Sequence, residues 1–297
     1  CQDSSRWGTI PRGGGRPETG AIGMGFTYFG YGSNMDRASL RAKGVEPIRS
    51  APAALHGHRL VFDVAHFFRH EGGVGNVRPT GRESDVVLGV LHECDDSALP
   101  LLDAAEARGY GYERLRLAVR TSDGEIEAWV YVGLPSFLDE TCLPTRRYLN
   151  ILVRGATEAG LDAGYVETLR RHPVFEPELR DGFVPPSAGR VVDEATLRAH
   201  PLYTVLDDHV FDMADARTHH DFLRTFFGGR DMTLFHLKRL DDSDGNETLE
   251  DVRAGRLTPR QRRYLDTYLH AYAHEYRYVG RFAPGPEADS PDPRRGP

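Results

Sequence analysis

The chain has little lysine and no excess of positive charge. Only Lys43 and Lys238 are lysines among its 37 basic residues, and the formal net charge is −7. We attribute the arginine bias to the codon usage of a GC-rich genome rather than to an arginine-based binding surface. A protein whose main partner is nucleic acid usually presents a basic face, so the acidic balance argues against nucleic acid as the partner.

Cysteine is scarce, and long apolar runs are missing. Cys1, Cys94 and Cys142 are widely spaced and odd in number, so neither a disulfide framework nor a zinc pattern follows from them. No apolar run is long enough to span a bilayer. We therefore expect a cytoplasmic protein in a reducing compartment, with no membrane partner.

The ends of the chain have compositions that differ from its centre. Residues 1–23 are rich in glycine, arginine and proline and lack the apolar segment of a signal peptide, so we expect them to be disordered. Met24 directly precedes the first apolar run and could be the true start. A processed lipoprotein beginning at Cys1 is the alternative. Residues 284–297 are expected to form a disordered tail.

Residues 24–175 have the pattern of one α+β domain, because strands dominate its first half and helices follow. His70 to Gly75 is expected to be a glycine-rich loop. Apolar runs predict strands from Phe26 and over 53–65, 86–92, 114–121 and 126–132, and helical spacing predicts helices over 37–43, 97–107, 144–159 and 163–171.

Residues 200–283 are expected to form a second, mainly helical domain of unknown role, joined through a linker at 176–199. Thr258-Pro259-Arg260-Gln261 has the spacing of a capping box with proline at the first helical position. An apolar and aromatic stripe follows it, as expected for a helix that packs into a core. Self-association through this domain is a possible role for it.

The most informative stretch is Tyr31-Gly32-Ser33-Asn34, which ends the first apolar run and precedes a polar segment. Glycine allows a sharp turn and a close approach to a ligand. The amide groups that follow it can converge on an anionic or carbonyl oxygen. An ordinary turn from a strand to a helix, with Ser33 or Asn34 as a cap, explains the local pattern equally well.

Two further segments support a functional interpretation. Three segments of this chain resemble, in the same order, three segments of the gamma-glutamylcyclotransferase family. They are the Tyr31–Asn34 stretch, Leu102-Asp103-Ala104-Ala105-Glu106 and the helix start Pro144-Thr145-Arg146-Arg147-Tyr148. The ending Gly160-Leu161 also fits. The resemblance covers residues 26–175 and does not extend to the C-terminal domain.

The resemblance implies a small mixed barrel-like sheet with flanking helices and a reaction that needs no cofactor and no metal. In that reaction a small gamma-glutamyl amide or amine cyclises to 5-oxoproline and releases the amine. Glu106 corresponds to the family's catalytic glutamate, and the amides of Gly32, Ser33 and Asn34 would bind the substrate. Tyr112 and Tyr148 look like pocket tyrosines, and Tyr31 is expected to pack within the same pocket.

One departure from the family leaves the substrate open. Ala107 stands where the family often has glycine after the glutamate, so the pocket for the leaving amine can differ. A tailoring enzyme that removes a gamma-glutamyl protecting group from a larger intermediate is one alternative. A binding module that keeps the pocket without useful turnover is the other.

Two possible metal sites are less convincing. His270 and His274 lie one helical turn apart, and His219-His220 could join them, but solvated or aromatic-packed histidines are the more ordinary explanation. Residues 242–246 resemble a calcium loop but fail the EF-hand register, because Leu240 would occupy the first ligand position.

Overall fold

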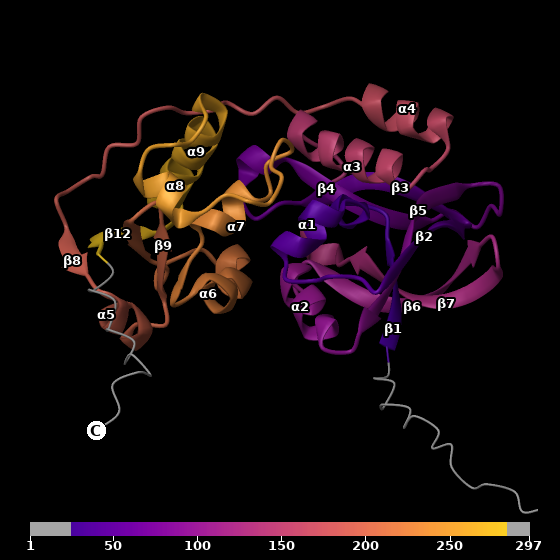
Figure 1. Ribbon diagram of the computed structural model, residues 1–297, viewed down its shortest axis with the longest axis horizontal. Helices are drawn as coiled ribbons and strands as arrows, with labels where there is room; N and C mark the ends of the chain where they lie inside the picture. Colours follow the sequence, from indigo (N-terminus) through magenta and orange to yellow (C-terminus); the bar gives the residue numbers. More distant parts are fainter. Residues whose placement is uncertain (1–24, 284–297) are drawn as a thin grey trace, which may run out of the picture.

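The computed structural model describes residues 25–283 and contains two units that pack against each other (Figure 1). The N-terminal unit is built on a closed barrel of strands in the order β1-β5-β2-β6-β7. Strands β1 and β7 pair in parallel, and the other neighbours are antiparallel. The expected α+β fold with a barrel-like sheet is confirmed. The barrel strands are β1 (Gly25–Gly30), β2 (Arg49–His56), β5 (Val86–Asp95), β6 (Tyr112–Thr121) and β7 (Gly124–Gly133).

A separate hairpin and four helices flank the barrel. The hairpin consists of β3 (His58–Ala65) and β4 (Gly73–Pro79), which pair antiparallel. The short turn between them contains a 3₁₀ helix at Arg69–Glu71. The helices are α1 (Arg37–Ala42), α2 (Ala98–Ala105), α3 (Arg146–Glu158) and α4 (Ala163–Arg171).

Two local expectations were wrong. The apolar stretch 53–65 is not one strand, because Gly57 adopts a left-handed backbone with φ of 70° and separates β2 from β3. Glycine tolerates that conformation without steric cost, so the chain can reverse there. The expected loop at 70–75 also ends early, since Gly73 already pairs with Ala65 in the hairpin.

The C-terminal unit contains the expected helices and also a five-stranded sheet that the sequence pattern did not indicate. Its strand order is β11-β9-β10-β12-β8. The strands are β8 (Arg190–Val192), β9 (Tyr203–Leu206), β10 (His209–Asp212), β11 (Arg230–Asp231) and β12 (Arg277–Phe282), and the helices are α5 (Glu194–Ala199), α6 (Asp221–Phe227), α7 (Thr233–Leu237), α8 (Leu249–Arg253) and α9 (Pro259–Glu275).

The segment 176–199 is more than a linker. Its second half supplies β8, which pairs in parallel with β12, and α5. Its first half runs over the C-terminal unit (Figure 1), where the N–H groups of Arg180 and Gly182 donate to side chains of α9. The expected disorder of residues 1–23 and 284–297 lies outside the described residues. Within 25–283, no helix is long and apolar enough to cross a membrane.

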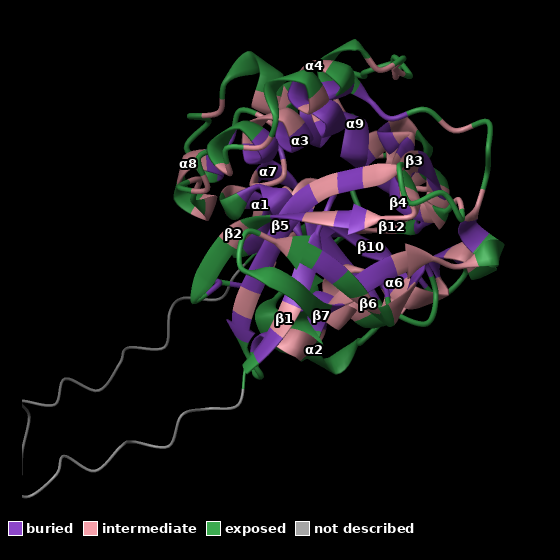
Figure 2. Ribbon diagram, turned by 90° about the vertical axis from the view of Figure 1, so that its right-hand side faces the viewer, coloured by how far each residue is buried: buried purple, intermediate pink, exposed green. Residues whose placement is uncertain are grey.

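Helix α9 begins as its sequence predicts and forms the core of the C-terminal unit. Thr258 and Gln261 form a reciprocal capping box, and Pro259 is the first helical residue. The middle of the helix is buried, whereas α4 and α8 lie largely at the surface (Figure 2). Its buried stripe consists of Tyr264, Leu265, Tyr268, Leu269 and Tyr272.

The N-terminal unit inserts the turn between β3 and β4 into this core. Phe68 is almost completely buried and belongs to the same apolar cluster as α9. Its ring stacks on those of Phe227 and Tyr272, with centroids 6.3 and 5.4 Å apart. The two units therefore share one core at this place rather than meeting at a flat surface.

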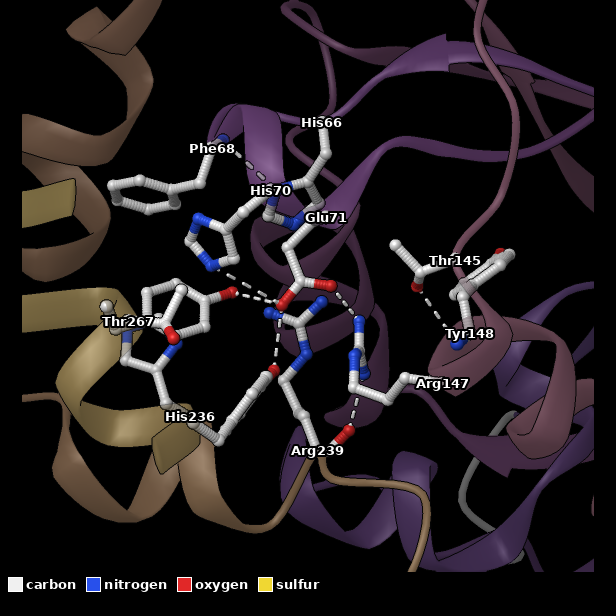
Figure 3. A network of polar contacts seen from close by, with 12 residues as sticks. His66, Phe68, His70, Glu71, Thr145, Arg147, Tyr148, His236, Arg239 and Thr267 are labelled. Carbon is white, nitrogen blue, oxygen red and sulfur yellow. Dashed lines mark hydrogen bonds and ion pairs between the residues drawn. The ribbon is translucent and has the colours of Figure 1, made fainter. Parts of the chain in front are cut away.

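A buried carboxylate accompanies Phe68 in the same turn. Glu71 is 1% exposed and forms an ion pair with Arg147 of α3. The hydroxyls of Tyr264 and Tyr268 donate to its Oε1 at 2.8 and 2.7 Å. Figure 3 shows the Glu71 carboxylate facing the guanidinium of Arg147. Burial acts to raise the pKa of Glu71, but Arg147 and the neighbouring cationic groups outweigh it and hold the pKa well below its usual range.

The Glu71→Gln variant is therefore expected to weaken the junction between the units. Removing one member of a buried ion pair leaves the other charge uncompensated and typically costs about 3–5 kcal/mol. Unfolding by urea at pH 7 measures the loss. Glu46→Gln is the matched control, because the Glu46 side chain is 56% exposed and its contact with Arg37 is long; it should change the free energy of unfolding by under about 1 kcal/mol.

The ion pair between Glu71 and Arg147 also makes the free energy of unfolding depend on pH. Because the folded pKa of Glu71 is depressed, its contribution is complete above the unfolded pKa of about 4.3 and is lost as the pH falls toward the folded pKa. The stability difference between the native protein and Glu71→Gln should shrink below about pH 4. A difference that stays constant from pH 7 to pH 3 would contradict this assignment.

Candidate active site

The Tyr31–Asn34 stretch forms a tight turn at the end of β1. A 3₁₀ helix covers Ser33–Met35. The N–H groups of Met35 and Asp36 donate to the carbonyls of Gly32 and Ser33 at 3.0 and 3.1 Å. A short helical turn leaves its first N–H groups without acceptors inside the turn. One of them, the N–H of Ser33, is directed at the Tyr148 hydroxyl and acts to lower the pKa of that tyrosine.

Buried side chains hold this turn from behind. His92 of β5 is fully buried, and its Nε2 lies 2.9 Å from the carbonyl oxygen of Asn34. Burial lowers the pKa of His92 to about 4, against the opposing effect of that hydrogen bond. The ring is therefore neutral near pH 7. On the other side, Asp36 accepts a double hydrogen bond from the guanidinium of Arg154 in α3, at 2.6 and 3.0 Å.

A small polar pocket of about 30 Å³ opens in front of the turn. It brings together every site residue that the sequence predicts, although the roles of these residues stay predictions. It also contains three residues that sequence reasoning missed, one each from β1, β4 and β7. The predicted members are Tyr31, Gly32, Ser33, Asn34, Glu106, Tyr112 and Tyr148, and the additional ones are Tyr28, Gly75 and Tyr131.

Glu106 follows directly after α2, and two donors hold its carboxylate. Its side chain is 16% exposed. The amide Nδ2 of Asn34 and the Nζ of Lys43 both lie 2.8 Å from its Oε1. Lys43 also donates to the Oδ1 of Asn34. Sequence reasoning gave no role to Lys43. The scarcity of lysine, with only two in the chain, is a signal that could have pointed to it.

The electrostatics keep Glu106 ionised. Burial acts to raise its pKa, but the charge and hydrogen bond of Lys43, the Asn34 amide and the charge of Arg239 outweigh burial and lower it. Burial lowers the pKa of Lys43, and Glu106 opposes that shift. The carboxylate is therefore a proton acceptor beside an ammonium group that can compensate its charge.

Gly75 of β4 connects the pocket tyrosines. Its N–H donates to the hydroxyl of Tyr148 at 3.0 Å, and its carbonyl accepts from Tyr112 at 2.7 Å. Tyr31 turns its hydroxyl to the carbonyl of Tyr131 at 2.6 Å, so it packs as well as lining the pocket. A side chain at Gly75 would place its Cβ 3.1 Å from the Tyr148 hydroxyl, which explains why the smallest residue stands there.

Ala107, where the family often has glycine, adopts a left-handed backbone with φ of 50°. A non-glycine residue in this region is strained, at a cost of about 1–3 kcal/mol. The strained residue stands directly beside Glu106, and it is buried. The backbone shape that glycine would favour is therefore kept here by a residue with a side chain.

A larger cavity of about 100 Å³ adjoins the polar pocket and lies between the two units. Ser33, Glu106, Tyr112 and Tyr148 line both spaces. The C-terminal unit contributes residues of α6, of α7 and of the turn after α7 to this cavity: Phe222, Leu223, Phe226, Phe227, Phe235, His236 and Arg239.

The histidines considered as metal ligands do not come together. His219 stacks on Phe137, with ring centroids 4.1 Å apart. His220 contacts the hydroxyl of Tyr276 and the carbonyl of Phe67, each at 2.9 Å. Among residues 25–283, no group of three or more histidine, cysteine, aspartate or glutamate side chains is placed to hold a metal ion.

Comparison with known proteins confirms the family resemblance for the central part of the chain. Residues 86–169 match the AIG2-like family. A gamma-glutamyl cyclotransferase, gliK of Claviceps purpurea, is 24% identical over 146 residues, which is 47% of this chain and 66% of that protein. The match thus spans just under two thirds of the relative.

Solved structures also align with this chain. An uncharacterized protein from Homo sapiens is 27% identical, with a TM-score of 0.44, over 55% of this chain and 94% of its own. A gamma-glutamyl cyclotransferase is 26% identical, with a TM-score of 0.45, over 55% of this chain and 95% of its own.

The Tyr148→Phe variant is expected to destabilise the protein, because it leaves the buried N–H of Gly75 without its acceptor. An unsatisfied buried donor costs about 1–3 kcal/mol. The free energy of unfolding measures this loss. Tyr110→Phe is the control, since Tyr110 is 48% exposed, and it should leave stability unchanged. Equal stability of both variants would show that the Gly75 contact contributes nothing.

Proposed function

We propose that this protein is a gamma-glutamylcyclotransferase-type enzyme, which converts a gamma-glutamyl amide or amine to 5-oxoproline and a free amine. The observation that carries the proposal is the ionised Glu106, held by Lys43 and Asn34 at the wall of a pocket that the Gly32–Asn34 turn also lines. The AIG2-like match and the relationship to gamma-glutamyl cyclotransferases support it.

In the proposed reaction the substrate supplies its own nucleophile. Glu106 takes a proton from the α-ammonium group, and the resulting amine attacks the γ-carbonyl carbon to close a five-membered ring. The C–N bond to the leaving amine then breaks as that nitrogen receives this proton from Glu106. The ring nitrogen gives its second proton to the regenerated carboxylate, which passes it to the departing amine, so that the amine leaves as an ammonium ion and the ring keeps one N–H. Holding a substrate in the folded conformer can supply about 7–11 kcal/mol of the barrier, so the enzyme mainly positions the substrate and moves two protons from the attacking nitrogen to the leaving one.

The turn has the remaining task of binding negative charge. The amides of Gly32, Ser33 and Asn34 are fixed by the 3₁₀ turn and by His92 behind it. Preorganised donors stabilise a developing oxyanion without reorganising during the reaction. Tyr112 and Tyr148, both tied to Gly75, would shape the sides of the pocket.

A cytoplasmic protein with a small gamma-glutamyl substrate and no nucleic-acid or membrane partner remains our expectation from the sequence. The tailoring alternative gains support from the cavity beside Glu106, because the C-terminal unit contributes to its wall. A substrate larger than a simple dipeptide would have contacts available there.

Glu106→Gln tests the reaction directly. Glutamine keeps the size and one hydrogen-bond acceptor but removes the base, so 5-oxoproline release from a panel of gamma-glutamyl peptides and amines should fall about 10²–10⁴-fold. Glu93→Gln is the control, because Glu93 lies on β5 with a 47% exposed side chain, and its rate should equal that of the native protein. Release that survives in Glu106→Gln would remove Glu106 from the mechanism.

Lys43→Met tests the electrostatic part of the proposal. Loss of the ammonium removes the main influence that lowers the pKa of Glu106, so burial should then raise it. Because Glu106 must be ionised to accept a proton, the acidic limb of the kcat/KM profile should move to higher pH. In the control variant Lys238→Met the limb should stay in place, and an unmoved limb in Lys43→Met would contradict the pairing.

A further inference from the structure

We propose that the C-terminal unit completes the substrate site and selects the leaving amine. The cavity between the units is suited to an amine that carries an aromatic or similar apolar body together with an anionic group, and Arg239 is positioned to bind that group. This inference rests on the proposed cyclotransferase function and specifies the substrate class of the same site.

The polar pocket and the larger cavity adjoin each other at Glu106, and this arrangement places the leaving amine in the cavity between the units. Glu106 lines both spaces and must lie beside the nitrogen that it protonates. The small polar pocket at the Gly32–Asn34 turn is suited to the charged end of the glutamyl group. The part of the substrate beyond the scissile bond then extends into the larger cavity, which is the space that the C-terminal unit borders.

Nine of the 22 residues that line this cavity are phenylalanine or tyrosine, and most of those from the C-terminal unit are phenylalanines. Phe222 stacks on Phe67 of the N-terminal unit, with ring centroids 5.8 Å apart. Phe226 in turn packs edge-on against Phe235 at 5.3 Å. Rings of this kind favour an apolar or aromatic partner, through buried area and through stacked or edge-to-face contacts. A small aliphatic leaving group would leave most of this surface unused.

Arg239 is the cation of the cavity that has no partner. Its guanidinium lies 4.9 Å from the ring centre of Phe235. Within residues 25–283 the structure records no hydrogen bond and no ion pair for that guanidinium. By contrast, Lys43 is paired with Glu106. Burial lowers the pKa of His66 to about 3 and that of His236 well below its usual range, so both rings are neutral.

The backbone of Arg239 is held in place from the N-terminal unit. Arg147 donates to the Arg239 carbonyl at 2.6 Å while it pairs with Glu71 (Figure 3). The neighbour of Arg147 is Tyr148, a residue of the polar pocket. This contact fixes the start of the Arg239 side chain, and the Phe235 ring lies beside its guanidinium. A guanidinium can bind a carboxylate through two parallel hydrogen bonds.

A pair of substrates isolates the proposed contact. Gamma-glutamyl-phenylalanine and gamma-glutamyl-phenethylamine share the ring and differ in the carboxylate of the leaving amine. The native protein should prefer the first in kcat/KM by roughly ten- to a hundredfold, the usual range for a hydrogen bond between charged groups. Arg239→Met should abolish this preference, and Arg239→Lys should restore part of it.

Two controls separate this role from others. Lys238→Met changes the neighbouring charge without altering the cavity wall, and it should keep the preference. Gamma-glutamyl-alanine keeps the carboxylate but lacks the ring, and it should be a poorer substrate than gamma-glutamyl-phenylalanine. If Arg239→Met slows both aromatic substrates equally, Arg239 acts at the glutamyl end or through the charge of Glu106, and the inference is wrong. It is also wrong if the native protein shows no preference.

Failure of the proposed reaction can be told apart from failure of this inference. If the native protein releases no 5-oxoproline from any of these substrates, the cyclotransferase proposal fails for them. Calorimetric binding of the same two aromatic substrates to the native protein and to Arg239→Met then decides the inference by itself. A carboxylate preference that depends on Arg239 supports the subsite, and equal binding in both proteins overturns it.

Discussion

The ion pair between Glu71 and Arg147 is the interaction on which the rest of the structure depends. A buried carboxylate is costly unless its charge is compensated and its oxygens are hydrogen-bonded. Arg147 compensates the charge, and two tyrosine hydroxyls from α9 satisfy Oε1. Since these partners come from both units, the carboxylate is satisfied only when the units are docked.

The contacts between the two units are connected to the candidate site through neighbouring residues of α3 and through a few hydrogen bonds. Arg147 and Tyr148 are adjacent on α3, so the helix that pairs with Glu71 also presents a tyrosine to the polar pocket. The second guanidinium nitrogen of Arg147 holds the carbonyl of Arg239. Arg154, further along α3, joins Asp36 behind the turn to the carbonyl of Asp241. One helix thus positions parts of both the polar pocket and the cavity between the units, the proposed glutamyl and leaving-group sides.

The C-terminal unit also contributes to the surroundings of the pocket that the barrel unit carries. The barrel unit carries the turn, Glu106 and the pocket tyrosines. The C-terminal unit covers the open side with aromatic rings and with the guanidinium of Arg239, which has no ion pair within residues 25–283. A cover that excludes water strengthens the electrostatic interactions beneath it, because the local dielectric falls. The pairing of Glu106 with Lys43 becomes more important in such an environment.

The local sequence determined a large part of this protein. The turn at Tyr31–Asn34, the capping box at Thr258 and the hairpin of β6 and β7 depend on residues close together in the chain, whose backbone preferences and hydrogen bonds are decided locally. The family segments also indicated which residues would meet, and all seven predicted residues line one pocket. What each contributes to the reaction stays a prediction.

Only the tertiary structure decided the features that depend on distant partners. Strands β8 and β12 pair although about ninety residues separate them, as with Arg190 and Gly280, and such short strands have no periodic pattern of their own. Lys43, Gly75 and Arg239 have no motif that marks them. They belong to the site because packing brings α1, β4 and the turn after α7 together around Glu106, and side-chain charge and burial acquire their meaning only in that arrangement.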